Sequence, residues 1–288
     1  MAVPLSTTPL VQASPAKGTN LQVEITRTTP IYPSKIFVQW ILRNPPVGVN
    51  FSFNIYRAGS SEGPWTQVAT ELANYFFVDE DFAANYTARL PGLFTLNSTV
   101  YYKIAAVQNH VEVAVTVDDV NNTLDARRRG IRRKLLRDAE IFLRKVMGTQ
   151  MVVLKRRQWG EPCPKCVTST GQSARAHCGT CYGTGIKDGY WAPVGGYAQR
   201  SATPVQTQTA TEGIIETNRM SVIMWNIPRV EARDIIAFLD GQRYVVEVVN
   251  PSQIHFVSVH QECSVSELAK GASEQNIIID PWHTPPWM

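Results

Sequence analysis

The chain has 288 residues, 44% of them hydrophobic, which is the composition of an ordinary globular protein with room for two or three domains. No apolar run approaches the length of a membrane span, and residues 1–17 lack a signal-peptide core, so we expect a soluble protein made and kept in a cytoplasm, with no membrane partner. The formal net charge of +4 hides an asymmetry, because residues 127–157 hold twelve Lys or Arg and two acids while the rest of the chain is net acidic.

The first part of the chain predicts an extended arm followed by a β-sandwich. Residues 1–19 are rich in Pro, Ser, Thr and Ala and show no periodicity, so we expect an arm that is disordered unless it lies on a neighbour. Residues 20–118 hold short alternating segments separated by turn residues, which is the pattern of a sandwich. The expected strands are 21–26, 36–42, 51–56, 64–68, 75–78, 100–107 and 111–117.

The sandwich segment resembles a fibronectin type III module. Trp40 lies where that family buries its strand-B tryptophan, and residues 56–65 and 101–107 match the later strands. The tyrosine corner of the family falls on Tyr101 or Tyr102. Residues 79–95 depart from the pattern and predict a short helix or a long loop. The resemblance covers about a hundred residues and implies adhesion or spacing rather than chemistry.

Residues 121–148 change to a helical period. Asn122 can cap this helix together with Asp125, and Gly148 is a natural stop. The apolar stripe is formed by Ile131, Leu135, Leu136, Ala139, Phe142, Leu143, Val146 and Met147. The arginines that oppose this stripe are Arg129, Arg132, Arg133, Arg137 and Arg144.

The basic helix has three interpretations that the sequence leaves open. Its arginines can follow the phosphates of a DNA backbone without reading base sequence. They can also pair with acidic side chains of a partner subunit, or form a solvated charged face. No aromatic residues interleave with them to support base stacking. A basic segment on an acidic body favours a local partner for that segment.

Residues 150–192 carry the most specific motif of the chain. Four of the five cysteines form two pairs, Cys163-Pro-Lys-Cys166 and Cys178-Gly-Thr-Cys181, with eleven residues between them. Each pair places two thiolates in one tight turn, and two turns complete the tetrahedron that Zn²⁺ accepts from sulfur ligands. Unligated thiols or two disulfides are the alternatives, but paired CxxC motifs at this spacing favour zinc. His177 could replace one sulfur, although the four-sulfur set needs no such help.

A four-thiolate site is closed, whereas a catalytic zinc keeps an open position, so we expect a structural metal. Residues 178–185 resemble the CxxCxGxG repeat of Hsp40 chaperones, but the sequence has one full copy and no His-Pro-Asp motif. The resemblance implies a zinc knuckle. Because residues 159–191 have little apolar content, we expect metal removal to unfold them and to leave the sandwich intact.

The last part of the chain predicts a small β-barrel and an extended tail. Within residues 193–270, the expected strands are 213–225, 230–239, 242–249 and 254–259, with a loop over 195–213 and a hairpin turn at Asp240-Gly241. The run from Arg233 to Gln261 resembles the small barrels of tailed-phage head-completion and stopper proteins. The tail, residues 271–288, carries Trp282 and Trp287, which we expect to be buried on the chain itself or on a neighbouring subunit.

The sequence as a whole predicts a mainly β, multidomain protein without catalytic motifs, so we expect no enzyme and no small-molecule substrate. It resembles structural proteins of tailed-bacteriophage virions, at the neck or head–tail connector. The resemblance implies a homo-oligomeric ring that is assembled in the host bacterial cytoplasm and contacts portal and tail proteins, with the basic helix on the portal or on the DNA backbone in the channel. The alternatives are a baseplate or collar component that binds surfaces through its sandwich, a zinc-dependent nucleic-acid-binding regulator, and an Hsp40-like cofactor.

Overall fold

The computed structural model describes residues 21–31, 35–46, 48–80, 100–119, 126–166, 178–202, 206–210, 213–217, 219–254 and 257–279. Several expectations fall outside these residues: the N-terminal arm, most of the 79–95 insertion, the Asn122 cap, His177, and the tail tryptophans Trp282 and Trp287. The predicted mainly β fold is confirmed. No helix within the described ranges combines the length and the hydrophobicity of a membrane span.

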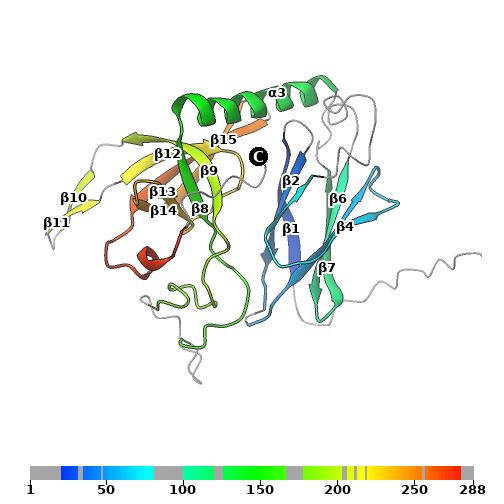
Figure 1. The fold of residues 1–288 in the computed structure, drawn as a ribbon, viewed down its shortest axis with the longest axis horizontal. Coiled ribbons are helices and arrows are strands. Elements are labelled where there is room, and N and C mark those ends of the chain that lie inside the picture. Colours follow the sequence, from blue (N-terminus) through cyan, green and yellow to red (C-terminus); the bar gives the residue numbers. More distant parts are fainter. Residues whose placement is uncertain are drawn as a thin grey trace, which may run out of the picture.

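The N-terminal part forms two antiparallel sheets that enclose one core (Figure 1). One sheet has the order β1-β2-β5 and comprises β1 (Gln22–Ile31), β2 (Lys35–Arg43) and β5 (Phe76–Asp79). The other has the order β4-β3-β6-β7 and comprises β3 (Ser52–Ala58), β4 (Thr66–Leu72), β6 (Tyr101–Gln108) and β7 (Val111–Asp119). Trp40 is fully buried and packs on Phe53 across the core, with ring centroids 5.1 Å apart.

A buried polar triad ties the two sheets together. Asp79 accepts hydrogen bonds from Arg57 Nη1 and from the Tyr102 hydroxyl, both at 2.6 Å. Burial raises the pKa of Tyr102 well above its usual range, so this phenol stays a donor. Of the two tyrosines that the family resemblance left open, Tyr102 is the buried one and Tyr101 is half-exposed.

The helical segment lies across both halves of the protein (Figure 1). It consists of α3 (Ala126–Phe142) and the π-helical turn η1 (Leu143–Met147), and it stops at Gly148 as predicted. Its buried side chains are Leu136, Ala139 and Leu143. The carbonyl oxygen of Leu136 accepts a hydrogen bond from Trp225 Nε1 at 3.1 Å, on the side of the C-terminal half. Arg132 Nη2 donates to the carbonyl oxygen of Thr28 at 2.6 Å, on the side of the sandwich.

The C-terminal half is a closed six-stranded barrel of order β12-β15-β14-β13-β8-β9. Its strands are β8 (Thr149–Leu154), β9 (Val194–Ala202), β12 (Arg219–Trp225), β13 (Ile235–Phe238), β14 (Arg243–Ile254) and β15 (Val257–Glu267). The hairpin of β10 (Gln206–Ala210) and β11 (Gly213–Thr217) projects from it, and the short helix η2 (Ser273–Asn276) follows β15 (Figure 1).

The barrel differs from the one expected over residues 193–270. Strand β8 belongs to it, because residues 151–154 are buried throughout and pair with β13 on one side and β9 on the other. Part of the segment expected to be a loop is strand β9. Gly196 makes this close packing possible, since a Cβ there would lie 2.9 Å from the Met151 methyl carbon. The cysteine-bearing segment is therefore an insertion between two neighbouring strands of the barrel.

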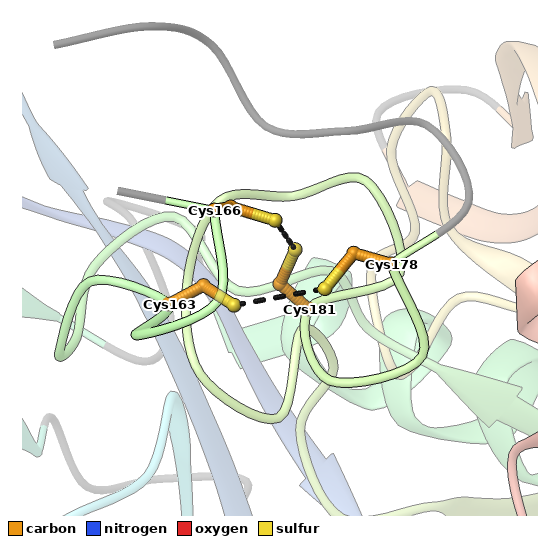
Figure 2. Close-up of side chains that lie close together, drawn as sticks. All are labelled: Cys163, Cys166, Cys178 and Cys181. Atoms are coloured by element: carbon orange, nitrogen blue, oxygen red, sulfur yellow. Dashed lines mark hydrogen bonds between the residues drawn. The ribbon is translucent and has the colours of Figure 1, made fainter. Parts of the chain in front are cut away.

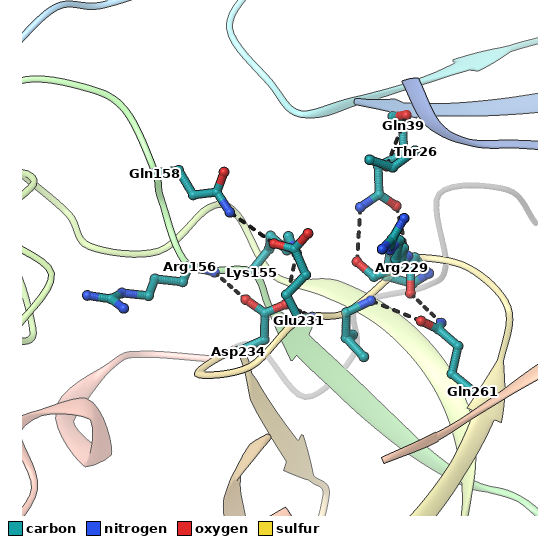
Figure 3. Close-up of polar contacts among 11 residues, drawn as sticks. Thr26, Gln39, Lys155, Arg156, Gln158, Arg229, Glu231, Asp234 and Gln261 are labelled. Carbon is teal, nitrogen blue, oxygen red and sulfur yellow. Dashed lines mark hydrogen bonds and ion pairs between the residues drawn. The ribbon is translucent and has the colours of Figure 1, made fainter. Parts of the chain in front are cut away.

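The sandwich and the barrel meet at the loop between Trp225 and Asp234 (Figure 3). Gln39, from the sandwich, donates to the carbonyl oxygen of Arg229 at 2.9 Å and accepts from its backbone N–H at 2.8 Å. Gln261, from the barrel, donates to the carbonyl oxygens of Trp225 and Pro228 and accepts from the backbone N–H of Val230. Both glutamines are fully buried, so each half of the protein holds the same loop through backbone groups.

Candidate metal centre

The four paired cysteines converge on one point (Figure 2). Their sulfur atoms all lie within 4.8 Å of one another, and all four side chains are buried. The sulfurs of Cys163 and Cys178 are 3.8 Å apart, and those of Cys166 and Cys181 are 3.5 Å apart. No disulfide joins them. The sequence prediction that these four residues form one cluster capable of binding a metal is confirmed.

The sulfur geometry fits a tetrahedral metal. A tetrahedron of four sulfurs at the Zn–S distance of about 2.3 Å has edges of about 3.8 Å. The two measured separations come within a few tenths of an ångström of that edge. A site closed by four protein sulfurs has no open position for water, so a bound ion would support the fold rather than act on a substrate.

Backbone hydrogen bonds hold the cysteine turns in place. The N–H of Cys166 donates to the carbonyl oxygen of Cys163 within the first turn, and the N–H of Cys163 donates to the carbonyl oxygen of Gly185 at 2.8 Å. Gly189 has a positive φ of 60°, and a Cβ there would lie 2.5 Å from the carbonyl oxygen of Cys181, so glycine is required. Two short bridges, Arg156 with Tyr190 and Pro162 with Ile186, close the insertion into a ribbon.

The thiols of the second pair have different acidities. Hydrogen bonds from the backbone N–H groups of Thr180 and Cys181 lower the pKa of Cys178 to about 6. Burial raises the pKa of Cys181 to about 12. Cys178 is therefore the easier of the two thiols to deprotonate, and a cation beside the cluster would favour the thiolate form of both.

The insertion is anchored to the sandwich by two tryptophans. Trp159 and Trp191 are almost completely buried and pack against each other with their rings tilted by 56° and their centroids 5.2 Å apart. Trp159 meets Phe53 edge-on at 5.7 Å, and Trp191 lies 5.9 Å from Tyr75, so both join the core of the sandwich. This packing argues against the expectation that metal loss would leave the sandwich intact, because the two parts share one hydrophobic core.

On the barrel side, the insertion begins with a buried ion pair (Figure 3). Lys155 Nζ lies 3.1 Å from Asp234 and 3.0 Å from Glu231, and only 4% of the Lys155 side chain is exposed. Asp234 also accepts hydrogen bonds from the backbone N–H groups of Arg156 and Glu231. Arg157 follows and lies over the Trp191 ring at 4.4 Å. Lys155 and Arg157 belong to the basic segment 127–157 of the sequence, but in the structure both side chains are engaged within the protein and away from the helix.

The predicted arginines of α3 do not form a single outward row. The side chain of Arg129 is outside the described part of the structure. Arg132 reaches the sandwich backbone, and Arg133 takes part in an interaction within the chain. Arg137 pairs with Asp138, and Arg144 pairs with Glu140 at 3.2 Å.

A different feature of α3 was not expected from the sequence. Part of its predicted apolar stripe faces solvent: Ile131, Phe142 and Val146 are 39%, 43% and 68% exposed. The neighbouring positions Leu136, Ala139 and Leu143 are the ones that pack on the protein. The stripe in the sequence was wide enough for two surfaces, and periodicity alone does not indicate which of them the protein buries.

No protein family matches this chain, and neither does any curated protein. Among solved structures, the chain is similar to an Fn3-like protein from Clostridium thermocellum at 24% identity. That similarity covers 36% of this chain and 92% of the other, with a TM-score of 0.22. A similarity of this size carries no argument about the fold or the function.

Proposed function

We propose that the protein is a structural subunit of a tailed-phage virion, a neck or head–tail connector that forms a homo-oligomeric ring between portal and tail. In this proposal it is not an enzyme, and it is assembled in the cytoplasm of the host bacterium. Its sandwich is a fibronectin type III-like spacer. The run from Arg233 to Gln261, which resembles head-completion and stopper barrels, spans β13, β14 and the start of β15.

The observation that carries the proposal is the exposed apolar flank of α3. Ile131, Phe142 and Val146 lie on one side of the helix and span about 22 Å, from the helical rise of 1.5 Å per residue. Exposed apolar side chains on one side of a helix support a contact with another protein. The helix is held rigidly by its bonds to Thr28 and Trp225, so the flank is presented in a fixed orientation. A preformed surface of this kind suits a subunit of an assembly.

We further propose that the ion held by Cys163, Cys166, Cys178 and Cys181 is Zn²⁺. Soft sulfur donors in a closed tetrahedral set favour zinc over harder cations such as Mg²⁺ or Ca²⁺. When bound, the ion would supply cross-links among four points of a segment that has a small core of its own. The cysteines position the two turns, and Trp159 and Trp191 transmit that order to the sandwich.

Negative-stain electron microscopy of the zinc-loaded protein tests the proposal. We expect rings in the wild-type protein and their loss in Phe142→Ser/Val146→Ser, because that variant removes the apolar contact. Leu239→Ser/Val248→Ser is the matched control, since these barrel residues are 50% and 52% exposed and lie outside α3. Discrete monomers at micromolar concentration, or rings that persist in the α3 variant, would count against the connector.

A zinc-dependent nucleic-acid-binding protein is the second candidate. Nine Lys or Arg between Arg127 and Met147, against two acids, favour it. It predicts that the monomer binds duplex DNA with an affinity that falls steeply with salt, at about −0.9 in logarithmic slope per phosphate contacted. DNA backbone contacts would leave the apolar flank of α3 uncovered, so Phe142→Ser/Val146→Ser should not weaken this binding.

A further inference from the structure

Lys155, Asp234 and Glu231 bring one amine and two carboxyl groups together at the start of the cysteine-bearing insertion (Figure 3). Nζ of Lys155 lies 3.1 Å from Oδ2 of Asp234 and 3.0 Å from Oε2 of Glu231. The side chains of Lys155 and Asp234 are 4% and 2% exposed, whereas that of Glu231 is 27% exposed. Asp234 is therefore enclosed together with the amine, while Glu231 contacts the same amine and keeps contact with solvent.

The strand pairing of the barrel holds Lys155 against Asp234. Leu154 on β8 pairs with Ile235 on β13 in an antiparallel register, so the residue after Leu154 faces the residue before Ile235. These neighbours are Lys155 and Asp234, at the end of a ladder whose side chains are buried. Because both strands belong to the closed barrel, the amine and the carboxyl group are kept at contact distance, which greatly favours a reaction between them.

The carboxyl group of Asp234 is prepared for attack by an amine. Burial raises its pKa, and the charge of Lys155 and two backbone hydrogen bonds oppose that rise. The neutral acid, which is the form that an amine attacks, is therefore easier to reach here than in water. Oδ1 accepts a hydrogen bond from the N–H of Arg156 at 2.9 Å, and Oδ2 accepts one from the N–H of Glu231 at 2.7 Å. The N–H group at Oδ1 would stabilise negative charge forming on that oxygen.

Glu231 lies in the position of a general base. Its Oε2 is 3.0 Å from the nitrogen of Lys155, which is within the range for proton transfer. The same oxygen accepts a hydrogen bond from Nε2 of Gln158 at 2.9 Å, so the carboxylate is oriented. One acid is enough to pair with a lysine, and the second acid lies where it can take a proton from the amine.

We propose that Lys155 and Asp234 become joined by an intramolecular amide bond, with Glu231 as the general base. A proton passes from the ammonium of Lys155 to Oδ2 of Asp234, which leaves a neutral amine and a neutral acid. Nζ then attacks Cγ, and negative charge forms on Oδ1. The Glu231 carboxylate takes one proton from the attacking nitrogen and returns it to the Oδ2 hydroxyl, which leaves as water while the double bond to Oδ1 re-forms. The products are one amide and one water molecule, so the reaction consumes no other reactant.

The bond would fasten β8 to the loop that precedes β13. Lys155 and Asp234 are 79 positions apart, and the chain between them contains the cysteine ribbon and the strands β9 and β12. The bond would close this part of the chain into a covalent ring, beside the contact through which Gln39 holds Arg229. This modification is separate from the cysteine cluster, and it does not depend on the proposed virion role.

Mass spectrometry of the reduced, denatured full-length protein tests the proposal. We expect the wild type to be lighter than its sequence by one water molecule. A tryptic digest should contain a branched peptide in which Lys155 is joined to Asp234. The digest is required because a succinimide at Asp188-Gly189 or Asp240-Gly241 loses the same mass without joining two peptides.

Glu231→Gln separates the chemistry from folding, because it keeps the size of a partly exposed side chain and removes its basicity. General base catalysis contributes about 10²–10⁴-fold, so the bond should form more slowly by about that factor, and the freshly purified variant should have the mass of its sequence. Glu161→Gln is the matched control. It makes the same change in the exposed ion pair of Glu161 with Lys187, and its Lys155–Asp234 bond should be complete.

The wild-type digest decides whether the bond exists, whatever the stability of the variants. A wild type with the mass of its sequence would overturn the proposal, and so would a lighter wild type without the Lys155–Asp234 peptide. A peptide that joins Lys155 to Glu231 would show that the wrong acid had been assigned. Complete linkage in freshly purified Glu231→Gln would exclude Glu231 as the base.

Discussion

Removing the metal from the cysteine cluster is expected to loosen the β-sandwich as well as the segment that carries the cysteines. Cys166→Ser, or chelation under reducing conditions, removes the cross-link that holds the ribbon. The segment between Trp159 and Trp191 is then no longer cross-linked, so it no longer holds these side chains against Phe53 and Tyr75. Truncating one buried tryptophan typically costs about 3–5 kcal/mol, so undocking of even one should lower stability by a comparable amount.

For a cooperative unit of about 150–250 residues, that loss of stability corresponds to a fall in Tm of roughly 6–20 °C. Hydrogen exchange locates the effect: the amides of β3, which carries Phe53, should exchange faster in the metal-free protein. Cys263→Ala is the control, because Cys263 is buried in the barrel core away from the cluster. Unchanged exchange in β3 after complete metal removal, with faster exchange confined to residues 159–191, would refute the shared-core argument.

Three further predictions concern Gln39, Asp234 and His260. In a urea titration, Gln39→Ala should lower the free energy of unfolding by about 1–3 kcal/mol, because two backbone groups of Arg229 lose their partner. The control Gln253→Ala, at an exposed position of a strand, should have little effect in the same titration. Asp234→Ala should lower the free energy of unfolding by about 3–5 kcal/mol, because it leaves the ammonium of Lys155 buried with Glu231 as its remaining acid. Equal stability of the variant and the wild type in a guanidinium titration would contradict this prediction. Burial lowers the pKa of His260 below its ordinary value of 6.5, so the imidazole is protonated more readily in the unfolded chain, and the free energy of unfolding should fall as the pH drops below 6.5. His260→Gln should flatten that part of the plot of stability against pH.

The sequence predicted the features that depend on short-range patterns. The alternation of Phe51, Phe53 and Ile55 indicated a sandwich strand, and the structure has β3 there. The two CxxC pairs indicated one cluster, because each pair is a local turn and two turns are enough for four ligands. Gly148 marked the end of the helix. In each case the residues that form the feature lie within a few positions of one another.

What the sequence did not predict depends on partners that are far apart in the chain. Strand β8 was assigned to the ribbon segment, because nothing within residues 149–154 shows that β13 will pair with it. Lys155 looked like part of a basic surface, since its partner Asp234 lies 79 positions away. Trp159 and Trp191 delimited the cysteine segment, but their packing on the sandwich was not foreseen. Trp159, four positions after Lys155, was the local signal that this stretch enters a core, because tryptophan is highly buried on average.

The position of the ribbon between β8 and β9 has a consequence for the order in which the protein folds. The connection from Leu154 to Val194 contains 39 residues, and joining Cys163 to Cys181 shortens the free loop to roughly half that number. Halving a loop reduces its closure cost by about 0.6 kcal/mol, which is small beside the stability of a domain. The barrel can therefore close before any metal arrives. Metal uptake then becomes a late maturation step, and the newly made chain passes through a stage in which the barrel is finished but Trp159 and Trp191 are not yet held against the core of the sandwich.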